Sequence, residues 1–157
     1  MYKTNRLKWL EPLLRVLLTA LLLPLGASAA SPFRGTAALA TTRRAVAFGE
    51  RSSGSAENRR QRDWILTELK PLGGQVTLDS FTAQTPAGPV EMANIILKFP
   101  GNSGKAIAVS GHYDTKRIPM VHFVGANDGG SSTGFLLEFA SAAARVKRRN
   151  DLLIIFF

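Results

Sequence analysis

The 157-residue sequence predicts an α/β sandwich with a mixed central sheet. Residues 106–109 form a continuously apolar run that suits a strand covered on both faces, and residues 152–157 form a second such run. A helix-like pattern separates the two runs, so they are expected to pair in parallel through a right-handed crossover. Two alternating segments, 76–80 and 93–99, flank a Pro/Gly turn and indicate an antiparallel hairpin.

The N-terminal segment has the layout of a secretory signal peptide. A basic start is followed by an apolar run over residues 16–25 and by small residues at 26–30. The run is too short for a spanning helix, so residues 1–30 are predicted to be a signal peptide, with an uncleaved anchor as the alternative. The protein is then expected to be secreted or periplasmic, with no stable membrane insertion after cleavage.

The composition excludes several kinds of site. The chain has no cysteine, which excludes a disulfide scaffold, a thiolate metal site and a cysteine nucleophile. Any bound metal would be held by His, Asp or Glu. Lys and Arg total 20 against 11 Asp and Glu, a formal net charge of +9. These basic residues cluster in a leader and at helix ends, which is typical of solvated surface, so no nucleic-acid partner is expected.

The helices follow from periodicity and from the residues that start and stop them. Residues 31–54 are rich in small and basic residues and are predicted to be a flexible leader, within which residues 37–48 could form a short helix. A helix over 55–69 begins at a serine cap and places Trp64 in the core. A second helix is expected over 132–148. Its predicted inward face consists of Phe135, Leu136, Phe139, Ala140, Ala143 and Val146.

Two acid–base side chains directly follow the strand predicted at 106–109. They are His112 and Asp114, at the edge where α/β sheets usually bind ligands. On an extended backbone, residues i and i+2 project to the same side. His112 is therefore a candidate metal ligand, and Asp114 is a candidate for orienting its ring. A simple hydrogen bond between the two side chains is the alternative interpretation.

A third candidate, Asp128, lies in a glycine-rich stretch, 125–134, that leads into the second helix. Its carboxylate can serve as an oxygen ligand for zinc, whereas a plain turn beside a helix N-terminus is the alternative. The hydroxyl residues that open the helix are Ser131, Ser132 and Thr133. These hydroxyls are expected to cap the helix rather than to supply a serine nucleophile. His122 and Lys116 are expected at the loop surface.

The combination of these elements is more specific than either alone. The His-Tyr-Asp triplet at 112–114, followed after thirteen residues by Asp128, resembles the zinc metallopeptidase superfamily of aminopeptidases and glutaminyl-peptide cyclotransferases, peptidase family twenty-eight. Segments 112–116 and 123–128 are most similar to the glutaminyl cyclase branch. The resemblance extends from residue 94 to residue 157.

The resemblance implies a fold and a metal site. The fold is a three-layer sandwich with a mixed central sheet, of the zinc aminopeptidase and phosphorylase/hydrolase-like type, and the cofactor is Zn²⁺, as one or two ions. Asp128 matches a zinc ligand, His112 matches a ligand of the two-metal enzymes, and Asp114 matches an aspartate that supports the ligands. The general acid/base glutamate and further ligands are expected after Phe157. The region over 55–157 is therefore expected to be the N-terminal part of a domain, truncated within a core strand and without a catalytic residue of its own.

The implied function is that of an exported glutaminyl-peptide cyclotransferase acting on peptides with a free N-terminus. A zinc aminopeptidase of the same superfamily is the first alternative. A non-catalytic secreted binding domain that kept the fold without the metal is the second. By itself, the 157-residue chain is expected to bind zinc weakly and to show no turnover.

Overall fold

The computed structural model describes residues 32–157, so the predicted signal peptide over 1–30 lies outside the described residues. The helices are α2 (Gly35–Val46), α3 (Ala56–Leu69) and α4 (Ser131–Ala143), and the strands are β1 (Gln75–Thr85), β2 (Gly88–Phe99), β3 (Ala106–Gly111) and β4 (Asp151–Phe156). Two short helical turns, η2 (Lys70–Leu72) and η3 (Ala126–Gly130), precede β1 and α4. Within residues 32–157, every helix is too short or too polar to cross a bilayer.

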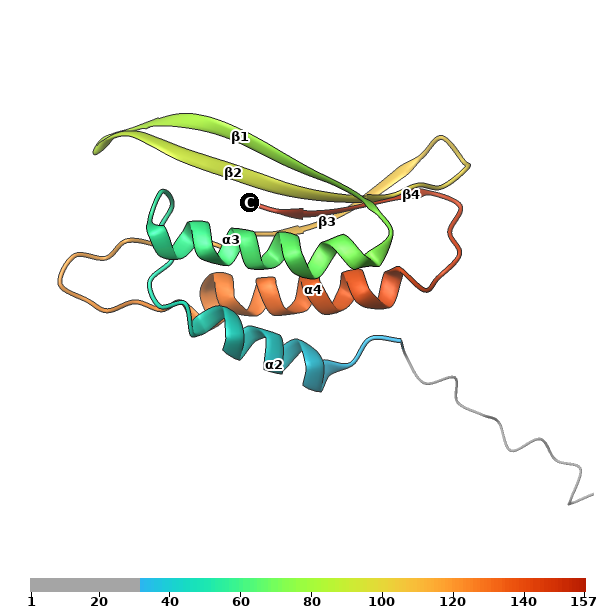
Figure 1. The fold of residues 1–157 in the computed structure, drawn as a ribbon, viewed down its shortest axis with the longest axis horizontal. Coiled ribbons are helices and arrows are strands. Elements are labelled where there is room, and N and C mark those ends of the chain that lie inside the picture. The colour runs from blue at the N-terminus through green and yellow to red at the C-terminus, as the bar shows by residue number, and fades with distance from the viewer. Residues whose placement is uncertain (1–31) are drawn as a thin grey trace, which may run out of the picture. The chain divides into compact units, whose positions relative to one another are not determined.

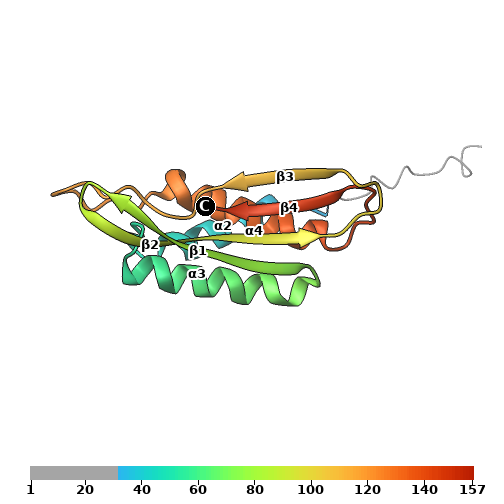
Figure 2. The same cartoon turned by 90° about the horizontal axis from the view of Figure 1, so that it is seen from above.

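The four strands form one mixed sheet in the order β1–β2–β4–β3 (Figure 2). β1 pairs antiparallel with β2, and β2 pairs antiparallel with β4. β3 and β4 pair in parallel, and the chain passes through α4 between them, because two parallel strands cannot be joined by a tight turn. The α/β class, the mixed sheet and the hairpin predicted from the sequence are confirmed.

The core lies between one face of the sheet and the helices. Alternate residues of β2 and β4 are buried on this face: Ala93, Ile95, Leu97, Phe99, Ile154 and Phe156. α3 and α4 pack on the sheet, and α2 packs on α4 on the side away from the sheet (Figure 1). Trp64 of α3 is 8% exposed and belongs to this core, as predicted. A three-layer sandwich has helices on both faces of its sheet, whereas the helices within residues 32–157 lie on one face.

Within the leader expected over residues 31–54, the short helix expected at 37–48 is present at nearly those bounds. Gly35–Val46 form α2, and its residue Ala45 is fully buried against the core. The close approach of α2 and α4 depends on Gly134, because a Cβ at that position would lie within 3.0 Å of atoms of Thr42 in α2. The packing surface of α2 is made of small residues, and their weak periodicity in the sequence gave little sign of a buried face.

Two further expectations about burial are corrected. β3 was expected to be covered on both faces, but it lies at the edge of the described sheet and Ile107 is 52% exposed. On α4, Leu137 is buried, whereas Phe135 of the predicted inward face is 43% exposed. Val146, also predicted for that face, lies beyond the end of α4 and is 51% exposed. The reason is that α4 lies between the sheet and α2, so its buried surface faces two directions and does not follow a single stripe.

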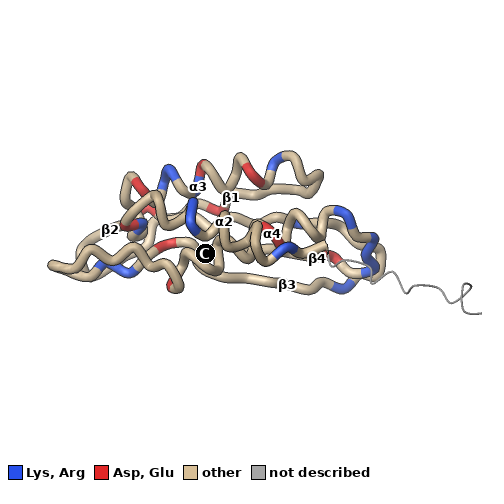
Figure 3. Tube along the Cα trace, turned by 90° about the horizontal axis from the view of Figure 1, so that it is seen from below, with Lys and Arg blue, Asp and Glu red and all other residues tan. Residues whose placement is uncertain are grey.

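α4 also ends at Ala143, five residues before the predicted end. The guanidinium of Arg148 donates hydrogen bonds to the carbonyl oxygens of Ala143, the last residue of α4, and of Val146 in the following turn, so a basic side chain contacts the helix end from outside the helix. Blue segments gather at this turn in Figure 3, over residues 145–149. One of the basic residues predicted to be part of the helix, Arg148, therefore lies beyond its end and contacts its last carbonyl.

Candidate metal centre

The end of β3 places His112 and Asp114 on the side of the chain opposite Tyr113. The N–H of Tyr113 donates to the carbonyl of Phe157 at 2.9 Å, which continues the pairing with β4 by one residue. The ring of Tyr113 is buried, and its hydroxyl donates to the carbonyl of Ala93 at 2.8 Å. Burial raises the pKa of Tyr113 to about 12. Tyr113 thus anchors the segment from the core side and leaves its two neighbours pointing toward the loop.

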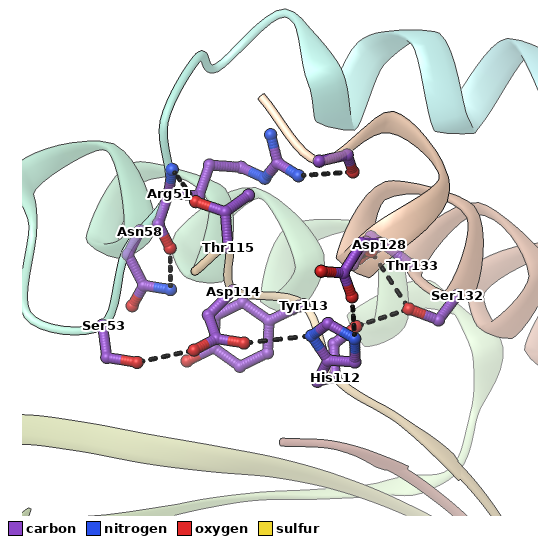
Figure 4. Close-up of polar contacts among 12 residues, drawn as sticks. Arg51, Ser53, Asn58, His112, Tyr113, Asp114, Thr115, Asp128, Ser132 and Thr133 are labelled. Atoms are coloured by element: carbon purple, nitrogen blue, oxygen red, sulfur yellow. Dashed lines mark hydrogen bonds and ion pairs between the residues drawn. The ribbon is translucent and has the colours of Figure 1, made fainter. Parts of the chain in front are cut away.

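The structure brings together the three predicted site residues (Figure 4). His112 Nε2 lies 3.0 Å from Asp128 Oδ1, and His112 Nδ1 lies 3.1 Å from Asp114 Oδ1. The second oxygen of Asp114, Oδ2, accepts a hydrogen bond of 2.7 Å from the Ser53 hydroxyl. The side chains of His112, Asp114 and Asp128 are 44%, 34% and 54% exposed, so the cluster is open to ligands from solvent.

Asp128 reaches His112 because the chain turns sharply at two glycines on either side of it. Gly125 has a φ of +51° and Gly129 a φ of +90°, while Asp128 between them is extended rather than helical. A Cβ on Gly129 would lie closer than 3.0 Å to the carbonyl oxygen of Asp114. The turn that carries Asp128 is therefore in backbone contact with the segment that carries His112 and Asp114.

The hydroxyls that open α4 act differently from the predicted caps. The Ser132 hydroxyl donates to the carbonyl of His112 at 2.5 Å and to that of Gly129 at 3.1 Å. The hydroxyls of Thr133 and Ser131 likewise donate to backbone carbonyls of η3. A capping hydroxyl would accept from an amide, but here the N-cap of α4 is Gly130 and the turn before it presents carbonyls. Ser132 thus ties the start of α4 to the backbone of His112.

The charges of the cluster fit a cation between His112 and Asp128. A neutral imidazole carries one N–H and can donate to only one of the two carboxylates. When Nδ1 donates to Asp114, the Nε2 lone pair faces a carboxylate oxygen, which is unfavourable unless a proton or a metal ion lies between them. A tetrahedral zinc ion with bonds of about 2.0–2.2 Å holds its ligands about 3.4 Å apart, close to the observed 3.0 Å.

The described residues offer two of the four ligands that zinc usually takes. Within residues 32–157, no group of three or more His, Asp or Glu side chains is placed to hold one metal ion. The pair His112 and Asp128 therefore fits part of a zinc site. Their role as ligands, and that of Asp114 as support, stays a prediction.

Several residues around the site were missed from the sequence. Ser53, which holds Asp114, and Arg51, which is fully buried beside the Asp128 turn, both fall in the predicted leader. No sequence pattern marks them, because their partners lie more than sixty residues away. Lys116 is exposed, and His122 has a 77% exposed side chain with Nδ1 3.3 Å from Glu50, in agreement with the predicted loop surface.

Part of the chain is similar in sequence to known proteins. Residues 94–157 match Peptidase family M28. The glutaminyl-peptide cyclotransferase-like protein of Bos taurus is 35% identical over 96 residues, which cover 59% of this chain and 25% of that protein. The glutaminyl-peptide cyclotransferase of Drosophila melanogaster is 30% identical over 102 residues, covering 61% of this chain and 29% of that protein.

Solved structures show the same similarity at the level of the fold. A glutaminyl cyclase from an Acidobacteriales bacterium is 36% identical with a TM-score of 0.74, covering 79% of this chain and 44% of that one. A Zn-dependent exopeptidase from Parabacteroides distasonis is 32% identical with a TM-score of 0.71, covering 80% and 46%. This chain thus spans between a quarter and a half of the length of these relatives. The resemblance predicted from the sequence is confirmed: residues 94–157 match peptidase family M28, and glutaminyl cyclases and a zinc-dependent exopeptidase are among the proteins similar to this chain.

Proposed function

We propose that the protein is a zinc-dependent glutaminyl-peptide cyclotransferase, in which His112 and Asp128 bind zinc and Asp114 orients His112. The observation that carries the proposal is the contact of His112 Nε2 with Asp128 Oδ1 at 3.0 Å, with Asp114 on the opposite ring nitrogen. The names of the relatives support the choice of reaction, since glutaminyl cyclases occur among both the similar sequences and the similar structures.

In this proposal, the residues of the chain prepare the ligands. Asp114 accepts the Nδ1 proton of His112 and so fixes the tautomer that leaves Nε2 free to bind a metal. The Ser53 hydroxyl holds the other oxygen of Asp114 and keeps the carboxylate turned toward the ring. When bound, zinc would supply a Lewis acid that polarises a substrate carbonyl and stabilises the negative charge developing on its oxygen.

The reaction proposed is intramolecular. The N-terminal amine of the substrate peptide attacks the γ-carboxamide carbon of its own glutamine side chain, the C–N bond of the amide breaks, and ammonia leaves. The product is a pyroglutamyl peptide with the same number of residues, and no water is consumed. The proton transfers require a carboxylate near neutral pH, for which a glutamate after Phe157 remains the prediction.

A zinc aminopeptidase is the second candidate, because a Zn-dependent exopeptidase is among the similar structures. The two activities are separated by incubating the complete protein with a peptide that begins with glutamine. Cyclisation yields pyroglutamyl peptide and ammonia, whereas hydrolysis yields free glutamine and a shortened peptide. An N-acetylated form of the same peptide serves as the control that neither reaction consumes. If the free peptide yields neither pyroglutamyl peptide nor free glutamine, the result supports the non-catalytic binding domain.

The metal part of the proposal is tested on the 157-residue chain. Zn²⁺ is titrated while the ring resonances of the two histidines are followed by NMR. The His112 ring is expected to shift, and the exposed His122 ring serves as an internal reference. Asp128→Asn should weaken the response, whereas Asp63→Asn, at an exposed position, should leave it unchanged. If the His112 ring resonances do not shift on addition of zinc, the proposed ligand pair is contradicted.

The proposal also includes export, with cleavage of a signal peptide over residues 1–30. Exported protein collected from the expressing cells should begin at residue 30 or 31 when its N-terminus is sequenced. Recovery of an intact Met1 from that fraction would favour the anchor instead.

A further inference from the structure

A buried arginine lies directly behind the turn that carries Asp128. Arg51 is 0% exposed, and among residues 32–157 no carboxylate lies within ion-pair distance of its guanidinium. Instead, Nη1 donates to the carbonyls of Gly49 at 2.7 Å and Val124 at 2.9 Å, and Nη2 donates to that of Gly125 at 3.4 Å. A buried charge without a partner of opposite sign is costly, which calls for an explanation beyond filling space.

The main chain of Arg51 holds the other end of the same loop. Its N–H donates to the Thr115 hydroxyl at 2.9 Å, and its carbonyl accepts from the N–H of Thr115 at 3.1 Å. The Asn58 side chain donates to the same carbonyl at 3.1 Å and fixes it from α3. Thr115 directly follows Asp114, so one residue contacts both the start and the end of the loop over 115–125 (Figure 4).

The preceding residue makes a third attachment. Glu50 Oε1 accepts a hydrogen bond of 2.9 Å from the N–H of Phe123 and lies 3.3 Å from His122 Nδ1. Glu50 and Arg51 together, named here the Glu50–Arg51 clasp, therefore contact loop residues 115 and 122–125. These contacts hold the two ends of the loop over 115–125 close together. Closing a loop of this length costs chain entropy, and the contacts of the clasp offset that cost.

We infer that the Glu50–Arg51 clasp positions the metal site by closing this loop, so that Asp128 is held opposite His112. Only the part of this inference that concerns zinc binding rests on the proposed function. His112 and Asp114 are fixed to the clasp through Thr115, and Asp128 is fixed to it through Gly125, three residues before it. The distance between the two ligands is thus set by a third, shared element of the structure.

The chemistry of arginine suits this task. A guanidinium is planar and presents five N–H donors in a fixed fork, which lets Arg51 contact three carbonyls on two segments. Burial lowers the pKa of Arg51, and the nearby Asp114 carboxylate offsets only part of this effect. A neutral side chain of similar length would fill the space without fixing the carbonyls.

The test uses the 157-residue chain and four variants. Arg51→Met removes the fork, and Glu50→Ala removes the Phe123 attachment at an exposed position. Glu50→Gln keeps an oxygen that can accept from the Phe123 N–H and serves as the conservative rescue. Arg60→Met, on the exposed face of α3, serves as the matched control for loss of an arginine. Far-UV circular dichroism establishes which variants are folded.

Two readouts are measured on the folded variants. The first needs no metal: the nuclear Overhauser contact between the His112 ring and the Asp128 β-protons reports whether the two side chains still face each other. The second is the zinc dissociation constant from the His112 resonances. Loss of a residue that supports a ligand typically weakens metal binding about 10–100-fold. Arg51→Met is expected to lose the contact and to weaken zinc binding by about that factor.

Glu50→Ala is expected to weaken both readouts less than Arg51→Met does, and Glu50→Gln to restore them. If Arg51→Met does not fold, the comparison of Glu50→Ala with Glu50→Gln tests the inference. Retention of the His112–Asp128 contact in folded Arg51→Met, or equal readouts in the two Glu50 variants, overturns the inference. A chain that binds no zinc at all contradicts the proposed function, yet the metal-free contact still tests the clasp.

Discussion

Replacing Gly129 by alanine should disturb the fold more than replacing Gly73, another glycine with a positive φ. Gly129 has a φ of +90°, and a Cβ there would lie under 3.0 Å from the Asp114 carbonyl oxygen. Gly73 has a φ of +76° with nothing within 4 Å of the added Cβ. Both positions have a positive φ, but ψ is −41° at Gly129 and 10° at Gly73, so only Gly73 lies near the left-handed region that alanine tolerates. Gly73→Ala is therefore the control for a positive φ without a steric clash.

The expected magnitudes follow from these two contributions. A positive φ costs a residue with a Cβ about 1–2 kcal/mol, and this applies to both positions. Forcing an atom into an occupied space adds about 1–3 kcal/mol, and this applies to Gly129 alone. The smaller entropy of the unfolded alanine chain offsets part of the penalty at both sites and cancels in the comparison. Gly129→Ala should therefore lose about 1–3 kcal/mol more than Gly73→Ala.

The measurement is urea unfolding of the two variants and the parent chain, followed by circular dichroism. With an m-value of about 1–3 kcal/mol per molar urea, the difference corresponds to about 1 M in the unfolding midpoint. Equal midpoints for Gly129→Ala and Gly73→Ala would refute the close contact between the Asp128 turn and the segment of Asp114. The zinc response of His112 should fall in Gly129→Ala alone, since that contact also places the ligands.

Three other perturbations have outcomes that the structure specifies. Tyr113→Phe leaves the buried carbonyl of Ala93 without a donor and should cost about 1–2 kcal/mol in urea unfolding. Because burial raises the pKa of Tyr113 to about 12, the unfolded chain releases this proton first; stability should decline from about pH 10 upward in the parent, with a shallower slope in the variant. Asp114→Asn should leave the midpoint near that of the parent and weaken zinc binding about 10–100-fold; unchanged zinc affinity would remove Asp114 from the site. The hydrogen bond from Lys98 lowers the pKa of Asp151, so its stabilising effect is present above the unfolded pKa and is lost as pH falls; midpoints measured between about pH 5 and 3 should decline less in Asp151→Asn.

Local patterns in the sequence were sufficient for the elements whose signals are local. The alternation in β1 and β2 reflects the period of a strand, and the hydroxyl of Ser55 accepts from the N–H of Asn58 as an N-cap should. The same holds for His112 and Asp114, whose spacing by two residues places them on one side of an extended chain. Their meeting with Asp128 was inferable because the carboxyl end of β3 leads into the loop that carries it.

What the sequence could not reveal depends on contacts between distant segments. Arg51 looks like one more basic residue of a polar leader, since its carbonyl partners at 124 and 125 carry no sequence signal. The burial of α2 depends on its close packing against Gly134, which only the assembled helices create. The end of α4 was misplaced for a related reason: Arg148 contacts the last helix carbonyl from outside the helix, although its type suits a helical position.

Helix α4 meets two of its neighbours, β3 and α2, at a glycine. A Cβ on Gly111 of β3 would lie 2.8 Å from the Cβ of Ser132, and Gly134 admits α2 on the opposite side. At these two contacts, the absence of a Cβ on the glycine allows the close approach of the two elements. Exposed positions of α2 and α4 should consequently tolerate wide sequence variation without moving the metal ligands, whereas these two sites should tolerate almost none.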